Sequence, residues 1–335
     1  MSKGLGKLHS VAIVLTFMLT VGLLSGCGGG GEVAPPGPPE SETDIIVESQ
    51  YRQANITLDG VDSEEVWNDI EWTEIPITSR NYFEMKSFYD DDNVYFLFRW
   101  MDVSPSQIST TGKWYVRPDG SWNWDFKSDG FSIVWDTSRM PNFAYEACTP
   151  LCHDQPSDLN RRWMGTENPA DIQEFWNWNP GVTNAKGIMA AYLWGALPPG
   201  VSTDDPDFNN RITWGELPGE YGFYLNRDEN EIAPEEKIEG DHAPLWILKD
   251  EPASGDAALV QAYGQFQVPY YYLEVSRPRD PSNPDLTKFT VSENGWNDIL
   301  FAAAVFHSNE RDQKDYMQTA ATLRLVGKNV SVEEE

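Results

Sequence analysis

Short runs in which apolar and polar residues alternate are the dominant pattern of this sequence, and they predict β-strands. The clearest runs are residues 81–89 and 93–101, which the acidic turn at residues 90–92 separates in the manner of a hairpin. Further strands are expected at residues 56–58, 72–77, 130–136, 270–276, 298–306 and 320–326. Helical patterns are limited to residues 62–67 and 170–175. The pattern predicts a mainly β protein, an antiparallel β-sandwich with long irregular insertions.

The middle of the chain, residues 198–257, departs from this pattern because it is rich in Gly, Pro, Asp and Glu. A stretch of this length is unusual as one bare loop in a compact domain. It is expected to hold short strands of its own, such as residues 222–225 and 245–248, or to form an insertion that covers a site. We expect a single domain over residues 44–330, followed by an acidic tail at residues 331–335.

The first 26 residues have the organisation of a secretory signal peptide. A short basic start precedes an apolar run at residues 11–24, which is shorter than the roughly 20 residues that a membrane-spanning helix needs. The run ends at Leu24-Ser25-Gly26-Cys27, which is similar to a bacterial lipobox. We expect cleavage before Cys27, lipid on its sulfur, and a flexible Gly/Pro linker over residues 27–43.

Composition indicates where the domain works and which partners it avoids. The formal net charge is −29, and removal of the two signal-peptide lysines gives −29 − 2 = −31 for the mature chain. A surface this acidic repels nucleic acid phosphates, so we expect no nucleic acid partner. Because Gly28 follows Cys27, no aspartate favours retention at an inner membrane. In a host with two membranes we expect an anchor in the outer membrane, facing the periplasm.

Two cysteines, Cys148 and Cys152, remain besides Cys27. In an oxidising compartment a local pair of this kind predicts a disulfide. The chain also carries 14 Trp, 14 Tyr and 15 Phe, and such residues favour strands and line pockets for flat ligands.

Signatures of the common enzyme classes are absent from the sequence, which contains no Gly-x-Ser-x-Gly, no phosphate-binding Gly-rich loop and no His-Glu-x-x-His. The acidic residues 90–92 could offer oxygen ligands to calcium, but a solvated turn explains them more simply. We therefore expect no catalytic activity of the chain on its own.

Several segments, in order along the chain, resemble the haem-binding domain of the ethylbenzene dehydrogenase γ subunit and of the cytochrome c-552/DMSO reductase-like family. These segments are residues 58–62 with Trp67, 89–100 with Asp102, 129–135, 148–153, Asp171 with 175–178, 272–278 and 301–306. The resemblance implies a β-sandwich that holds one haem b between loops. It also implies electron transfer to or from a redox partner protein.

The resemblance further implies the residues that would hold the haem. Met164 lies in Trp-Met-Gly, ahead of the segment with Trp176 and Trp178, and Lys314 lies shortly before the last predicted strand. By resemblance, Met164 and Lys314 are the axial ligands of the iron, and the two tryptophans lie at the cofactor. A lysine ligand must be neutral, which a desolvated site beside iron favours. Asn179 stands where the family pattern has a lysine.

Cys148-Thr149-Pro150-Leu151-Cys152-His153 allows a second interpretation, covalent attachment of a c-type haem with His153 as a ligand. That attachment motif usually has two residues between the cysteines, and this chain has three. A disulfide and a haem b are therefore favoured, with His153 as the alternative ligand.

A cofactor-free function remains open at this point. Residues 59–60, Trp67 and residues 89–100 are also similar to family 9 carbohydrate-binding modules, and Trp114, Trp122 and Trp124 could stack on sugar rings. Such modules need neither the segment 148–153 nor the Trp-Met-Gly segment and closing lysine, which favours the haem protein.

Overall fold

β-Strands dominate the computed structural model, which describes residues 43–77, 81–103, 113–116, 122–125, 129–147, 171–195, 215–225, 242–244, 246–307 and 314–328. The strands are β1 Ile46–Tyr51, β2 Thr73–Pro76, β3 Tyr82–Tyr89, β4 Asn93–Met101, β5 Lys113–Val116, β6 Trp122–Asp125, β7 Gly130–Trp135, β8 Gln173–Trp178, β9 Ala190–Trp194, β10 Gly215–Glu216, β11 Gly219–Glu220, β12 Phe223–Leu225, β13 His242–Pro244, β14 Trp246–Leu248, β15 Ser254–Gly255, β16 Gln261–Gln267, β17 Tyr270–Pro278, β18 Trp296–Phe306, β19 Lys314–Tyr316 and β20 Ala321–Val326. The helices of this part are the single turns α1 Glu65–Asn68 and α2 Phe143–Glu146. None of its helices is long and apolar enough to span a bilayer. The predicted mainly β class is confirmed.

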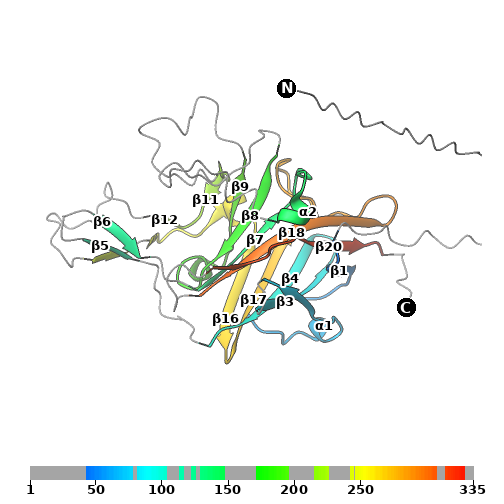
Figure 1. The fold of residues 1–335 in the computed structure, drawn as a ribbon, viewed down its shortest axis with the longest axis horizontal. Helices are drawn as coiled ribbons and strands as arrows, with labels where there is room; N and C mark the ends of the chain where they lie inside the picture. The colour runs from blue at the N-terminus through cyan, green and yellow to red at the C-terminus, as the bar shows by residue number, and fades with distance from the viewer. Residues whose placement is uncertain are drawn as a thin grey trace, which may run out of the picture. The chain divides into compact units, whose positions relative to one another are not determined.

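Thirteen of the described strands form one sheet, whose main path runs β10-β9-β8-β7-β18-β20-β1-β3-β4-β17-β16 (Figure 1). Most neighbours are antiparallel, as predicted, but β1 runs parallel to both β20 and β3. The sheet is therefore mixed. β1 has no hairpin partner to set an antiparallel direction, because α1 and β2 lie between it and β3 along the chain.

The sheet curls so that β16, β17, β4 and β3 face β18, β7 and β8 across one core. Trp100 on β4 meets Trp178 on β8 with ring centroids 5.9 Å apart, and the backbone of Ile188 bridges to Gln261 on β16. We call the surface that faces this core the inner face and the opposite surface the outer face. Because side chains alternate along a strand, Glu174, Trp176 and Trp178 are inner and Phe175 and Asn177 are outer residues.

The two halves approach most closely at Gly264, where β16 has no side chain. A Cβ on Gly264 would lie 2.5 Å from Cζ2 of Trp178. The indole cannot turn away freely, because its N–H donates to Asn184 Oδ1 at 3.1 Å and its ring packs against Trp100. Glycine is therefore a packing requirement at this position.

Gly264→Ala is expected to lower the free energy of unfolding by about 1–3 kcal/mol through overpacking. Gly195→Ala is the matched control, since a Cβ on Gly195 meets nothing within 4 Å. Urea unfolding of both variants, followed by tryptophan fluorescence, measures the difference. Equal stability of the two variants would mean that the halves do not pack at Gly264 as described.

Several predicted elements are confirmed, and two are wrong. The hairpin forms between β3 and β4, and Asp90 N–H donates to Asn93 O at its turn. Residues 56–58 are not a strand, and residues 173–175 of the helix expected at residues 170–175 belong to strand β8. β8 is central in the sheet, between β7 and β9, so pairing on both sides overrides a weak helical pattern.

The middle segment does contain strands of its own, as expected. β12 pairs with β14 within it, and Tyr221 stacks on Tyr192 of β9 with ring centroids 5.0 Å apart. The Tyr221 hydroxyl also donates to Ala191 O at 2.6 Å. Tyr221 therefore packs on β9, whereas β13 of the same segment pairs with β5.

Candidate cofactor site

Trp176 and Trp178, predicted at the cofactor, are fully buried on the inner face of β8. The Trp176 ring lies 5.1 Å from that of Trp135, and its indole N–H donates to Glu174 Oε1 at 2.6 Å. These contacts belong to the protein core and account for both tryptophans through packing. Their predicted contact with a cofactor stays a prediction.

The predicted iron ligands are described only in part. Lys314 begins β19, and its backbone is paired with that of Phe306 at the end of β18. Met164, His153, Cys148, Cys152 and Cys27 lie outside the described residues.

Small residues gather on the outer face of β18 and β7, next to β19. In paired rows across these strands, Phe306 faces Gly130, Ala304 faces Ser132, and Ala302 faces Val134. The register then pairs Lys314 with Phe306, and directly paired positions belong to the same face of a sheet. We call Gly130, Ser132, Ala302 and Ala304 the small-residue platform.

The small-residue platform is buried, with Ala302 at 0% exposure and Ala304 at 5%. Short side chains let another group come close to the backbone. At Gly130 that group is the Trp178 carbonyl, whose oxygen would lie 2.8 Å from an added Cβ. Two strand spacings are about 10 Å, so β18, β7 and β8 together offer a flat surface suited to a planar group.

Trp194 adds an unusual polar atom to the same outer face. Its ring stacks on Phe175 with centroids 4.2 Å apart. Its indole Nε1 is buried and finds no hydrogen-bond acceptor among the described residues. A buried donor of this kind is costly unless an acceptor reaches it. The outer face thus offers both a flat surface and a donor for an anionic group.

His307 follows β18 and lies among three aspartates from three other places in the sheet. Its Nδ1 lies 3.2 Å from Asp102 Oδ2, beyond β4, and its Nε2 lies 3.6 Å from Asp315 Oδ2 on β19. The bond to Asp102 raises the pKa of His307 above its usual value, although burial opposes this, and Asp315 and Asp129 raise the pKa further. The imidazole therefore links the ends of β18 and β4 to the start of β19.

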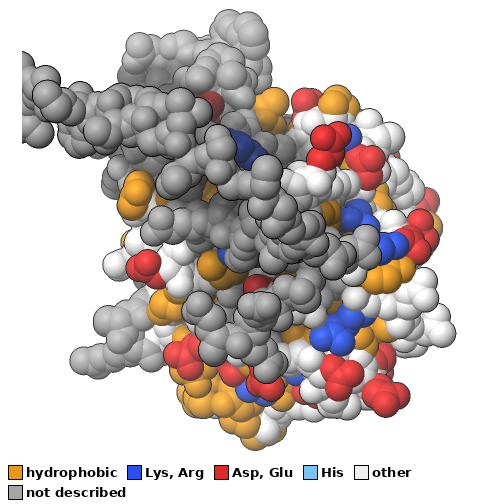
Figure 2. Space-filling view, turned by 90° about the vertical axis from the view of Figure 1, so that its right-hand side faces the viewer, with side chains coloured by type: hydrophobic (Ala, Val, Ile, Leu, Met, Phe, Trp, Pro, Cys, Tyr) orange, Lys and Arg blue, Asp and Glu red, His pale blue; other side chains and the backbone are white. Residues whose placement is uncertain are grey.

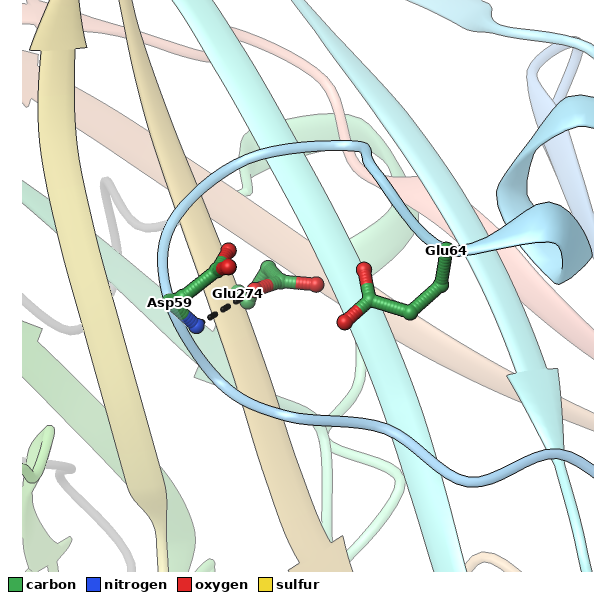
Figure 3. Close-up of side chains that lie close together, drawn as sticks. All are labelled: Asp59, Glu64 and Glu274. Carbon is green, nitrogen blue, oxygen red and sulfur yellow. Dashed lines mark hydrogen bonds between the residues drawn. The ribbon is translucent and has the colours of Figure 1, made fainter.

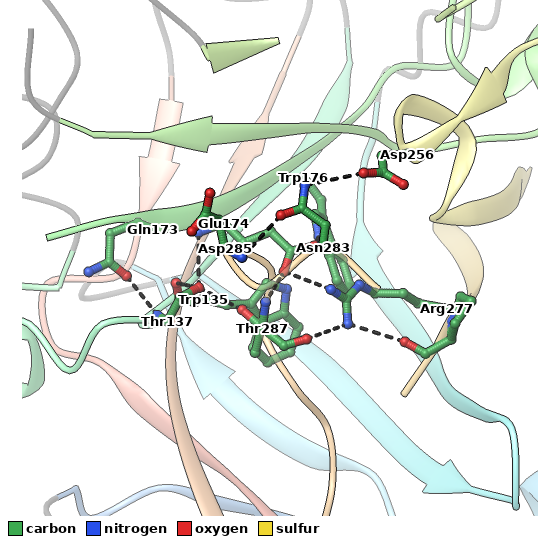
Figure 4. A network of polar contacts seen from close by, with 11 residues as sticks. Trp135, Thr137, Gln173, Glu174, Trp176, Asp256, Arg277, Asn283, Asp285 and Thr287 are labelled. Carbon is green, nitrogen blue, oxygen red and sulfur yellow. Dashed lines mark hydrogen bonds and ion pairs between the residues drawn. The ribbon is translucent and has the colours of Figure 1, made fainter. Parts of the chain in front are cut away.

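A buried ion pair joins the two halves of the core (Figure 4). Arg277 on β17 donates to Glu174 Oε2 on β8 at 2.9 Å, and both side chains are 0% exposed. Glu174 also accepts from the Thr287 N–H at 2.7 Å, and Arg277 donates to Thr287 O at 2.7 Å. The pair is thus well supplied with hydrogen bonds, as a buried charge pair requires.

Asp59, Glu64 and Glu274 bring carboxylate oxygens within 4.8 Å of one another (Figure 3). Glu274 already accepts the N–H groups of Asp59 at 2.8 Å and Gly60 at 2.9 Å, and the indole N–H of Trp67 at 3.0 Å. Its carboxylate therefore anchors the loop before α1 to β17. Burial, with a smaller contribution from Glu64, raises the pKa of Glu274 to about 7, although the three donors oppose this.

Glu274 should make stability depend on pH. Its folded-state pKa of about 7 exceeds the ordinary glutamate pKa of 4.5, so its contribution to stability is present below pH 4.5 and is lost as pH rises to about 7. Wild type is expected to lose stability over this range relative to Glu274→Gln. Urea unfolding at a series of pH values tests this, with exposed Glu71→Gln as the control that keeps the wild-type slope. Parallel curves for wild type and Glu274→Gln would contradict it.

Exposed hydrophobic side chains gather at one corner, where β4 ends beside the β16–β17 hairpin. Val103 is 81% exposed, Val268 84%, Met101 50% and Tyr82 40%. Figure 2 shows hydrophobic side chains gathered at the lower end of its view, where Figure 1 draws this hairpin. Patches of this kind mark contact surfaces.

Sequence reasoning missed Glu174, Arg277, Glu274 and His307. The signal for Glu274 was present, because it interrupts the apolar pattern of the predicted strand 270–276, and Arg277 directly follows that strand. Glu174 was hidden by the incorrect helix, and the platform by its small residues, which carry little hydrophobic pattern.

Comparison with known protein families gives a match that covers most of the strands and candidate site residues described above. The model of the family named ethylbenzene dehydrogenase matches residues 64–317, more than half of the chain. The chain belongs to the ethylbenzene dehydrogenase family. The matched region of this family member includes β18, the platform, His307 and Lys314. No curated protein matches the chain.

Among solved structures, a family 9 carbohydrate-binding module from Caldicellulosiruptor kristjanssonii is similar to this member of the ethylbenzene dehydrogenase family. Its complex with glucose matches at 12% identity with a TM-score of 0.38, over 86% of this chain and 100% of the module. Its complex with cellotriose matches at 12% identity with a TM-score of 0.37, over 87% and 99%. These scores are too low to support a functional inference.

Proposed function

We propose that this protein binds one haem on the outer face of its sheet and transfers electrons to or from a redox partner. The observation that carries the proposal is the buried small-residue platform, which lies beside the strand that begins with Lys314. Membership of the ethylbenzene dehydrogenase family supports a redox role.

The residues present fit a haem in three respects. The platform presents short side chains to a planar macrocycle, Trp194 offers a buried N–H to a propionate, and Lys314 stands in register with Phe306 at the platform's edge. We propose Lys314 and Met164 as the axial ligands, with His153 as the alternative partner of Lys314. A desolvated site would favour the neutral amine that an iron ligand requires. When bound, the haem supplies one-electron chemistry, and the chain supplies ligation, burial and orientation.

Location and partner complete the proposal. Lipid on Cys27 would anchor the protein outside the cytoplasm, and a disulfide between Cys148 and Cys152 would suit that compartment. We propose a basic redox partner, because a strongly acidic chain steers positively charged proteins toward it.

Filling the platform should displace the haem. Ala304→Leu is expected to add about 1–3 kcal/mol of overpacking strain to the haem complex, which lowers haem affinity roughly 5- to 150-fold. Ala54→Leu is the control, because Ala54 packs beside α1 on a different cluster. Haem titration of the apoproteins, followed at the Soret band, gives the affinities. Equal affinity in both variants would place the haem elsewhere.

A cofactor-free carbohydrate-binding module is the alternative. It predicts an apoprotein that stays colourless on haem titration and whose tryptophan fluorescence responds to cello-oligosaccharides. The haem proposal predicts the reverse in both assays.

A further inference from the structure

We infer that His307 is a positioning residue, which holds β19, and with it Lys314, against the end of β18 through Asp315. The inference rests on the proposed function, because it concerns the lysine that would ligate the iron. It assigns a role to the cluster of His307, Asp102 and Asp315, which the haem site itself does not use.

The chain directly after β19 is anchored, because the Met317 N–H donates to Ala303 O at 3.0 Å, but β19 itself is short. It has three residues, and within the described part of the chain it pairs with β18 alone, through Phe306, Val305 and Ala304. Backbone pairing over such a short edge strand fixes it weakly. Side-chain contacts from β19 to the rest of the domain therefore decide how firmly Lys314 is held.

Asp315 supplies those contacts, next to Lys314 in the chain. Its Oδ2 accepts a hydrogen bond from Asn81 Nδ2 at 2.5 Å and lies 3.6 Å from His307 Nε2. Its side chain is only 9% exposed, so these partners act in a largely water-excluded setting. The contact with Asn81 connects β19 to the start of β3, and the contact with His307 connects it to the end of β18.

Asp102 fixes the orientation of the imidazole that reaches Asp315. Asp102 Oδ2 lies 3.2 Å from His307 Nδ1, and the Asp102 backbone N–H donates to Pro269 O at 2.9 Å. The aspartate is 3% exposed and continues directly from the nine-residue strand β4. A residue anchored in this way can hold the other ring nitrogen toward β19, as outer-shell partners of metal ligands do.

Asp129 is the third acidic residue near His307, and it increases the expected effect on β19 of removing His307. It is fully buried, and its Oδ2 accepts the Tyr271 hydroxyl at 2.9 Å. Asp102 directly after β4, Asp129 directly before β7 and Asp315 on β19 thus lie around one imidazole, and its removal leaves three acidic groups close together. Because Asp315 lies on the shortest of these strands, β19 is the element expected to move.

The experiment compares His307→Asn, Asp315→Asn and Asn81→Ala with the control Asp280→Asn, which changes an aspartate in an exposed ion pair with Lys288. In haem-loaded full-length protein, imidazole is titrated as a competing ligand and followed by absorption. The cluster variants are expected to bind imidazole about 10-fold more tightly than wild type, the usual scale for loss of an outer-shell partner. Asp280→Asn is expected to match wild type.

Amide hydrogen exchange of the apoprotein gives a second measurement that needs no haem. Exchange at residues 314–317 should be at least 10-fold faster in His307→Asn and Asp315→Asn, and less so in Asn81→Ala, whose substitution site is exposed. Unchanged exchange and unchanged imidazole affinity would overturn the inference while leaving the haem proposal intact. A wild-type protein that binds no haem would defeat the proposed function, and with it the assigned role of His307.

Discussion

Arg277→Met is expected to destabilise the protein by about 3–5 kcal/mol, because it leaves the Glu174 carboxylate charged and unpaired in the core. Both side chains are 0% exposed, so water cannot replace the lost partner. The substitution also removes the donor to Thr287 O. Urea or thermal unfolding of the purified variant measures the loss.

Two further variants separate the ion pair from general damage to the core. Lys288→Met breaks an exposed ion pair with Asp280 and should cost at most about 1 kcal/mol. The double variant Glu174→Gln/Arg277→Met removes both charges and should recover part of the loss. If the double variant is as unstable as the sum of the two single variants, Glu174 and Arg277 are not coupled as described.

Lys314→Ala is expected to have the largest effect on function, because it removes a proposed ligand of the iron. Haem affinity should fall by more than the roughly 10–100-fold typical of outer-shell changes. Any haem that remains should shift from a six-coordinate low-spin spectrum to a high-spin one. Absorption and electron paramagnetic resonance spectra of the haem-loaded variant measure both effects.

Lys288→Ala is the matched lysine control for this experiment. Lys288 is exposed and paired with Asp280 at 2.8 Å, so its loss should leave the haem spectrum unchanged. If Lys314→Ala keeps the wild-type spectrum, His153 or another residue ligates the iron in its place.

Much of the fold follows from sequence pattern alone, because regular alternation survives in the buried strands. β3, β4 and β17 were predicted to within two residues, and the hairpin turn with them. β1 was missed, because its sequence Ile-Val-Glu-Ser-Gln-Tyr alternates weakly and it pairs in parallel. The first half of β8 was predicted as a helix. Its partner strands β7 and β9 lie elsewhere in the chain, so the local sequence does not reveal this pairing.

The candidate site was less accessible to sequence reasoning than the fold. Lys314 was identified by resemblance, but the residues around it come together only through sheet register. Asp102 is far in the sequence from His307 and Asp315, and the three meet because β4 and β18 end close to where β19 begins. The platform also needs the register, which places Ala304 opposite Ser132.

The absorption spectrum of the full-length protein, purified in detergent from haem-replete cells, tests the central claim most directly. The account predicts a Soret band, sharp α and β bands after dithionite reduction, and about one extractable haem b per chain by the pyridine haemochrome assay. A protein that is colourless as purified, and stays colourless when titrated with haem, would contradict it.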